Sequence, residues 1–124
     1  MTEEDANDIT ETIIGCAFRV SNTLGCGFLE KVYENAMMIE LKNEGLFAEN
    51  QKSINVFYRN ILVGEYFADI LVEREIIIEL KALKGIEEAH KAQLLNYLKA
   101  TKKRLGLILN FGRPKVEIKR ILNG

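Results

Sequence analysis

Through about residue 43, apolar side chains recur every three or four positions, the spacing that places them on one face of an α-helix. This pattern predicts one helix from about residue 5 to 24 and a second from about 29 to 43. Glycine follows both segments, and glycine commonly ends a helix because it accepts the left-handed conformation. The apolar positions are Ile9, Ile13, Ala17, Val20 and Leu24 in the first segment, and Leu29, Val32, Ala36, Ile39 and Leu41 in the second.

From Ser53 onward the pattern changes to the alternation of apolar and polar residues that is typical of β-strands. It predicts strands at about 54–58, 61–72 and 76–83, joined by short polar turns into an antiparallel meander. A helix is expected at about 87–102, followed by strands at 105–111 and 116–122. Because that helix is long enough for a crossover, we expect the strand at 105–111 to run parallel to the third strand. The last strand is expected at a sheet edge.

The hairpin formed by the second and third strands brings acidic side chains together. Folded about residue 74, its register pairs Val72 with Ile76, Ile70 with Ile78, and Asp69 with Glu79. Side chains alternate between the two faces of a strand, so Lys81 is expected on the same face as Glu79. Two facing carboxylates repel each other unless a positive charge lies between them. The pattern therefore predicts a divalent metal ion at Asp69 and Glu79; the alternative is an ordinary solvated sheet face, since 28% of the chain is charged.

Two helical segments contribute further candidate residues. Glu30 follows a glycine turn at the start of the second predicted helix, which makes it a candidate for reaching a neighbouring active site. In the helix at 87–102, His90, Gln93 and Tyr97 fall on one face. An amide and a phenol one turn apart can hold a phosphate oxygen or position Lys81 by hydrogen bonds. A polar helix face that simply meets water is the alternative interpretation.

Composition narrows the class of protein. The chain has 124 residues, 48% of them hydrophobic, which predicts one globular domain spanning 1–124. No apolar run approaches the ~20 residues of a membrane-spanning helix, and the acidic start differs from a secretory signal. Cys16 and Cys26 are too few for a disulfide framework, so we expect a reduced, cytoplasmic protein. His90 is the single histidine, which disfavours histidine-based metal clusters and nucleophile systems.

Charge is distributed unevenly along the chain although its net value is −1. Residues 1–80 carry six Lys or Arg and fifteen Asp or Glu, a balance of −9. Residues 81–124 carry eleven Lys or Arg and three Glu, a balance of +8. A basic C-terminal third is typical of a surface that follows nucleic-acid phosphates. The equally weighted alternative is that these cations pair with the acidic N-terminal helices.

Several of these residues together resemble a known family of proteins. Gly27, Glu30 and Tyr33 match the G-x-x-E-x-x-Y motif of the GxxExxY proteins. That family is assigned to the PD-(D/E)XK nuclease superfamily, and the resemblance runs from about residue 10 to residue 120. The elements that resemble the superfamily's motifs are Asp69, Glu79-Leu80-Lys81, and the pair Gln93 and Tyr97 in a Q-x-x-x-Y spacing.

The resemblance implies an α+β fold of the three-layer type with a restriction-endonuclease-like core. Such a core has a central mixed sheet that contains an antiparallel meander and is flanked by helices. It also implies a Mg²⁺-dependent (or Mn²⁺-dependent) endo- or exonuclease that hydrolyses phosphodiester bonds in DNA, with RNA as the less favoured substrate. The implied metal ligands are Glu30, Asp69, Glu79 and the carbonyl of Leu80, whereas Lys81, Gln93 and Tyr97 would act on the phosphate and the attacking water.

Two other classes of function stay open at this point. One is a non-catalytic nucleic-acid-binding module that keeps the nuclease fold, and the other is a protein-interaction or toxin–antitoxin accessory module. A binding module has no need for two carboxylates that repel each other, which favours the nuclease. A 14.1 kDa nuclease offers little surface with which to grip a duplex, so a homodimer is a further expectation.

Overall fold

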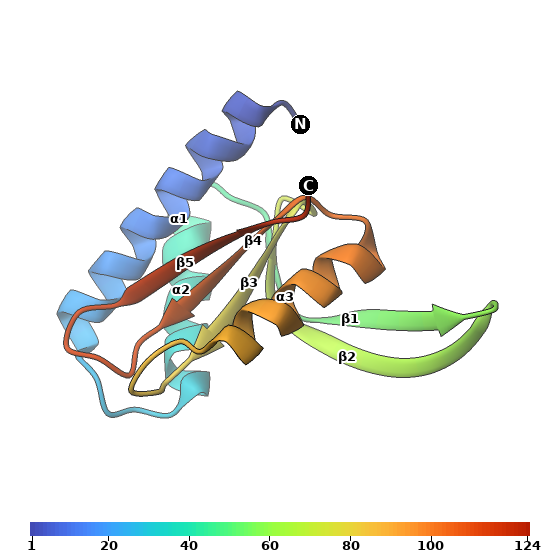
Figure 1. The fold of residues 1–124 in the computed structure, drawn as a ribbon. Coiled ribbons are helices and arrows are strands. Elements are labelled where there is room, and N and C mark those ends of the chain that lie inside the picture. Colours follow the sequence, from blue (N-terminus) through green and yellow to red (C-terminus); the bar gives the residue numbers. More distant parts are fainter.

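Five strands form one mixed sheet with helices on both of its faces (Figure 1). The computed structural model describes all residues, 1–124. Strand order is β1-β2-β3-β4-β5; β3 and β4 are parallel, and the other neighbours are antiparallel. The predicted α+β architecture is thus confirmed, including the crossover helix and the edge position of the last strand. The elements are α1 (Glu3–Leu24), α2 (Glu30–Asn43), β1 (Ala48–Tyr58), β2 (Ile61–Val72), β3 (Ile76–Lys81), α3 (Glu88–Thr101), β4 (Leu105–Asn110) and β5 (Glu117–Leu122).

Alternate residues of β3 pack into two separate apolar clusters, one on each face of the sheet. Ile76 and Ile78 lie in the larger cluster, which α1 and α2 cover. Ile77 lies in the smaller cluster, under Leu94 and Leu98 of α3. Both faces of β3 are therefore buried, and each fully buried side chain of this size contributes roughly 1.5–3 kcal/mol. A charged residue in such a strand carries a desolvation cost, which makes Glu79 an exception that needs a reason.

The turn between α1 and α2 is held by a buried tyrosine of the second helix. Gly25 and Gly27 have φ angles of 70° and 113°, a region that glycine enters without steric cost. The hydroxyl of Tyr33 donates to the carbonyl of Gly25 at 2.7 Å and accepts from the amide of Phe28 at 3.2 Å. Its ring stacks on Phe111 at a centroid distance of 4.7 Å. Tyr33 and Gly27 of the G-x-x-E-x-x-Y segment, together with Gly25 just before it, therefore build the helix entry.

A second buried anchor lies behind the end of β3. Asn110 is fully buried; its Oδ1 accepts from the amides of Leu83 and Gly112, and its Nδ2 donates to the Leu83 carbonyl and to Glu117. Gly112 packs so closely that a Cβ there would collide with the backbone of Leu83. These contacts fix the loop that follows Lys81, and so they fix where that lysine sits.

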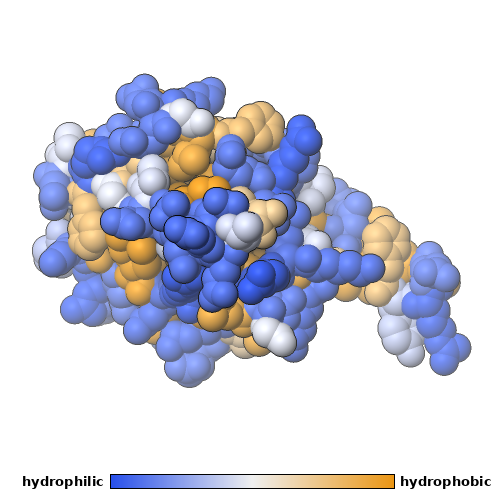
Figure 2. Space-filling model, turned by 90° about the horizontal axis from the view of Figure 1, so that it is seen from above, coloured by the Kyte–Doolittle hydropathy of each residue, from blue (hydrophilic) through white to orange (hydrophobic).

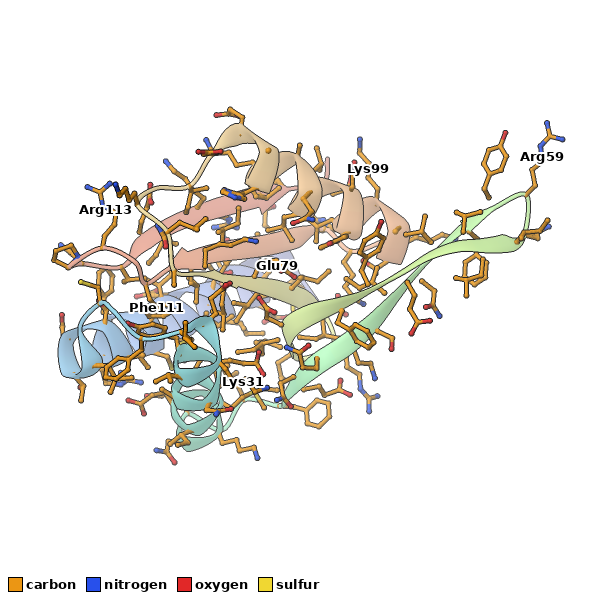
Figure 3. All side chains as sticks on the ribbon, turned by 90° about the horizontal axis from the view of Figure 1, so that it is seen from below. Lys31, Arg59, Glu79, Lys99, Phe111 and Arg113 are labelled. Carbon is orange, nitrogen blue, oxygen red and sulfur yellow. The ribbon has the colours of Figure 1, made fainter.

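Strands β1 and β2 continue beyond the body of the protein as a two-stranded arm (Figures 1 and 2), which we define as residues 53–67. β2 pairs with β3 only through residues 70–72, so the rest of β2 has β1 as its sole neighbour. Arg59 and Asn60 form the tip with φ angles of 51° and 64°, the tight two-residue turn that the sequence predicted. Figure 3 shows Arg59 at the far end of the arm, well away from Glu79.

Candidate active site

The acidic residues lie at the fork where β2 separates from β3. The ladder between these strands contains Val72 with Ile76 and Ile70 with Ile78, as predicted, and it ends there. Asp69 and Glu79 are therefore not a ladder pair, and this part of the predicted register was wrong. Instead, Oδ2 of Asp69 accepts a hydrogen bond from the amide of Leu80 at 2.7 Å. The Asp69 carboxylate thus accepts the hydrogen bond that a β2 carbonyl would accept from the Leu80 amide if the ladder continued.

On the neighbouring strand, Gln51 has an unusual backbone conformation. It lies between the ladder pairs of β1 and β2 that flank Asp69, and its φ angle is 51°. A non-glycine residue in the left-handed region costs about 1–3 kcal/mol, and such residues cluster at functional sites. The side chain of Gln51 reaches α2, where its Nε2 donates to Oε1 of Glu34 at 2.7 Å. The strained residue thus connects the fork to the second helix.

Glu34 is a buried carboxylate that is held by three donors. Its Oε2 accepts from Lys31 Nζ at 2.7 Å and from Asn50 Nδ2 at 3.1 Å, in addition to the bond from Gln51. Burial raises the pKa of Glu34, but the hydrogen bonds from Lys31, Asn50 and Gln51 outweigh it, so the pKa lies below its ordinary value. Glu34 is therefore ionised at neutral pH, and its negative charge acts on Asp69.

Glu79 is the least satisfied group of the site. The residue is 8% exposed, and its Oε1 is buried without a hydrogen-bond partner. Burial, followed by the charge of Asp69, raises the pKa of Glu79 to about 8, although Lys81 acts in the opposite direction. Burial also raises the pKa of Asp69, with the bond from the Leu80 amide as the main opposing effect. Two neighbouring acids with raised pKa values form a site that favours the arrival of positive charge.

Of the remaining predicted residues, Lys81 and Tyr97 lie close enough to the acidic pair to interact with its charge. Lys81 is half-buried at the end of β3, and its charge lowers the pKa of both Asp69 and Glu79. Tyr97 is buried on α3, and burial, followed by the charge of Glu79, raises the pKa of its hydroxyl. Gln93 is exposed one turn earlier and lines an open groove between α3 and the base of the arm, together with Tyr97. His90 instead caps its own helix, since its Nδ1 accepts from the amide of Glu87.

The structure does not bring Glu30 to the site. Glu30 is exposed at the first position of α2, whereas Glu34, one turn later, is buried and influences Asp69. In the sequence pattern Glu30 and Glu34 fall on one stripe of the helix, so only the observed burial of Glu34 distinguishes it. No sequence signal pointed to Gln51. Its contact with Glu34 accompanies a left-handed backbone conformation, and the alternation of apolar and polar residues does not reveal such a conformation. The alternation starts only at Ser53 in the sequence, whereas β1 begins at Ala48.

The side chains alone do not form a complete metal cage. No group of three or more His, Cys, Asp or Glu side chains lies close enough to enclose an ion. Mg²⁺ commonly uses only one or two protein carboxylates and keeps several waters, so two acids at the fork suit that ion. The backbone of Leu80 lies between Glu79 and Lys81, and its amide is already taken by Asp69.

The fold and the site define a class of protein: an α+β domain whose central hairpin presents two acids and a lysine beside a crossover helix. The sequence profile of the PD-(D/E)XK nuclease superfamily matches residues 7–121, and the chain belongs to this superfamily. The narrower GxxExxY family remains a resemblance. Comparison with curated proteins and with solved structures gave no match. No helix of the chain has both the length and the apolar character needed to cross a membrane.

Proposed function

We propose that this protein is a divalent-metal-dependent nuclease that hydrolyses phosphodiester bonds in DNA, with RNA as the second choice of substrate. One observation carries the proposal: Glu79 is a buried carboxylate with an unpartnered oxygen beside a second acid. A buried carboxylate without a partner costs stability, commonly several kcal/mol when it is ionised. A bound cation would offset this cost, because it supplies the positive partner that the ionised carboxylate lacks.

Asp69 and Glu79 would hold the ion, together with the carbonyl of Leu80. The donors are all hard oxygens, which is the ligand chemistry of Mg²⁺ and Mn²⁺. When bound, such an ion supplies Lewis-acid polarisation of a phosphate group. Glu34, rather than Glu30, would contribute to the site. It would act as a fixed negative charge and not as a metal ligand, because Lys31, Asn50 and Gln51 already donate to its oxygens.

Lys81, Gln93 and Tyr97 would act on the substrate. The ammonium of Lys81 stands at the end of β3 and would stabilise the negative charge that develops on a phosphate oxygen. The hydroxyl of Tyr97 is protonated at neutral pH, as in any tyrosine whose pKa is not lowered, so it can donate to a phosphate oxygen. Gln93 would bind the backbone of the substrate from the exposed groove.

The basic C-terminal third is available for a phosphate backbone. Five ion pairs within 4.0 Å are present, and none joins a cation of residues 81–124 to an acid of residues 1–80. The alternative, in which these cations pair with the acidic N-terminal helices, therefore has no ion pair to support it. Lys99 points from α3 into solvent (Figure 3) and lines the same groove as Gln93.

The test combines cleavage with direct metal binding. Purified protein is incubated with single-stranded and duplex DNA and RNA in Mg²⁺, in Mn²⁺ and in EDTA, and Mn²⁺ binding is measured separately by electron paramagnetic resonance. We expect cleavage only with metal, its loss in Glu79→Gln, and weaker Mn²⁺ binding in the same variant. Lys81→Met should lose cleavage but keep Mn²⁺ binding, because it removes no ligand.

Two results would overturn parts of this proposal. Mn²⁺ that binds equally well to the wild type and to Glu79→Gln would remove the metal site. Nucleic acid that is bound but never cut, in either metal, would favour the non-catalytic binding module.

A further inference from the structure

The groove between α3 and the base of the arm is lined by aromatic, amide and small side chains. Figure 1 shows α3 beside the arm where β1 and β2 leave the body of the protein. Tyr66 of β2 and Tyr97 of α3 supply the aromatic rings, and Gln93 and Asn96 supply the amides. Lys99 is the only charged residue in the lining. The groove therefore offers ring faces and hydrogen-bonding groups rather than a row of cations.

The ring of Tyr66 is exposed to solvent and is also held in place by its neighbours. The residue is 46% exposed. A Cβ added to Gly64 would lie 3.2 Å from a carbon of this ring, so the ring covers the backbone of the glycine. The ring of Tyr97 also packs against it, at a centroid distance of 5.4 Å and a tilt of 40°. The open part of the Tyr66 ring is thus a preorganised surface on which a flat group can stack.

A second exposed ring lies on the same face of the arm. Side chains alternate along β2, which puts Leu62 on the face of Tyr66. The register pairs Phe57 with Leu62, and directly opposed residues share a face. Phe57 is 61% exposed. Leu62 and Tyr66 are four residues apart, roughly 13 Å at about 3.3 Å per residue, so the two rings can serve different groups of one extended ligand.

The arm and the groove do not suit the backbone of a duplex. Arg59 and Glu65 are the only charged residues between Ser53 and Phe67, so the arm has no net charge. A duplex presents phosphates and keeps the faces of its bases stacked inside, and binding it needs several cations. Unpaired bases, in contrast, stack on exposed aromatic side chains without regard to sequence. Two exposed rings with few charges therefore favour an unpaired strand.

The groove is continuous with the candidate active site. Exposed apolar surface can also mark a protein interface, so its position decides between the two partners. Tyr97 lines the groove, and the charges of Glu79 and Asp69 raise the pKa of its hydroxyl. The same side chain thus faces both the acids and the groove. A ligand in the groove would lie next to the carboxylates, which is where a nuclease needs its substrate.

We propose that the groove and the adjoining face of the arm bind a single-stranded segment of DNA, with unpaired bases stacked on Tyr66 and Phe57. Gln93 and Asn96 would donate hydrogen bonds to the strand, and Lys99 would lie beside a phosphate. This inference rests on the proposed function, because it names the form of substrate that the same site accepts.

Fluorescence anisotropy in EDTA tests the inference apart from cleavage. The probes are a short labelled oligothymidylate, a strand of equal length made of abasic sites, and a blunt duplex. The oligothymidylate should bind at least about fivefold more tightly than the abasic strand, because stacking contributes about 1–3 kcal/mol per base. Tyr66→Ala and Phe57→Ala should each remove fivefold or more of the oligothymidylate affinity and leave the abasic strand unaffected. Tyr66→Phe keeps the ring and should bind as the wild type does.

The matched control is Tyr58→Ala. Tyr58 is 65% exposed, and it pairs with Ile61, which alternation puts on the opposite face of the arm. Its removal should leave binding of every probe unchanged. Far-ultraviolet circular dichroism checks that each variant is folded. If Tyr66→Ala does not fold, Phe57→Ala carries the test, because Phe57 is the more exposed of the two rings.

The outcomes separate this inference from the nuclease proposal. Equal affinity for the oligothymidylate and the abasic strand would overturn the inference, and so would an effect of Tyr58→Ala as large as that of Tyr66→Ala. Metal-dependent cleavage that is as fast on the blunt duplex as on the single strand would overturn the inference and leave the nuclease intact. Ring-dependent binding of the single strand without cleavage in Mg²⁺ or Mn²⁺ would overturn the nuclease and support the binding groove.

Discussion

The amide of Leu80 donates a hydrogen bond to the carboxylate of Asp69 at the point where β2 leaves β3, with a distance of 2.7 Å. This bond has two consequences. It satisfies the Leu80 amide, which has no backbone partner on β2 because the ladder between β2 and β3 has ended. It also holds one carboxylate oxygen of Asp69 beside Glu79. The divergence that creates the arm therefore also creates the acidic site.

Substitutions of Asp69 should separate these two roles. Asp69→Asn keeps an oxygen that can accept from Leu80 but loses the charge, so we expect stability near the wild-type value and weak Mn²⁺ binding. Asp69→Ala also leaves the partly buried Leu80 amide without its partner, which costs about 1–3 kcal/mol. Urea unfolding in EDTA, together with Mn²⁺ titration, measures both effects. Equal stability of the two variants would contradict the structural role of the hydrogen bond.

Stability of the metal-free protein should fall as the pH rises. The folded-state pKa of Glu79 is raised from about 4.5 to about 8. Between these values the unfolded chain has lost a proton that the folded protein retains, so the free energy of unfolding decreases with pH. The loss is complete only above pH 8, and it should amount to a few kcal/mol, since each pKa unit corresponds to about 1.4 kcal/mol.

Glu79→Gln is the variant that checks this pH dependence. An amide cannot ionise, so the variant should lose less stability than the wild type between pH 5 and pH 8 in EDTA. It should also be the more stable of the two at pH 8. Urea unfolding at both pH values measures the difference. Parallel pH profiles for the two proteins would show that Glu79 is not the responsible group.

Glu34 and Glu30 form a matched pair on one helix. Glu34→Gln removes the negative charge beside Asp69 and weakens the bonds from Lys31, Asn50 and Gln51. It should therefore reduce Mn²⁺ affinity, by roughly tenfold if Glu34 acts as outer-shell groups commonly do. Glu30→Gln makes the same chemical change at an exposed position and should have no effect. If instead Glu30→Gln lowered Mn²⁺ affinity and Glu34→Gln did not, Glu30 would have the metal-binding role that the sequence predicted for it.

The salt dependence of DNA binding tests the basic surface. Lys103 is unsuitable for this test, because its Nζ donates to the carbonyl of Arg74 at 2.9 Å and so supports the β2–β3 turn. Lys99 and Lys102 are exposed near the end of α3, and each phosphate contact changes the logarithmic salt slope by about 0.9 on duplex DNA. The double variant K99Q/K102Q should flatten the slope by up to about 1.8. The control is Lys42→Gln on α2, which lies on the opposite face of the sheet, and an unchanged slope in K99Q/K102Q would exclude these lysines from the interface.

Gly112→Ala should be strongly destabilising. The new Cβ would collide with the backbone of Leu83, which cannot move away because Asn110 holds it by two hydrogen bonds. We expect a loss of about 2–4 kcal/mol, at the upper end for single substitutions. Gly124→Ala, at the open C-terminus, is the control. A Gly112→Ala protein of wild-type stability would show that the loop after β3 is not rigidly held.

The sequence by itself determined the elements, their order and most of the hairpin register. Helical and alternating patterns are local, and a pairing such as Ile70 with Ile78 follows from a short turn between two apolar runs. The crossover helix likewise determined that β4 runs parallel to β3. Asp69, Glu79 and Lys81 could be chosen because charged residues inside apolar strands stand out from their surroundings.

Only the tertiary structure decided how these residues are arranged. The place where β2 leaves β3 depends on packing between distant elements, so alternation predicted a ladder pair for Asp69 and Glu79 where the structure has a side-chain bond to Leu80. Gln51, on the neighbouring strand, has a left-handed backbone, and its side chain bonds to Glu34 on a different element; neither feature is visible in the alternation pattern. Which turn of α2 faces the fork was also beyond the sequence pattern, because Glu30 and Glu34 lie on one stripe and only burial against the sheet separates them.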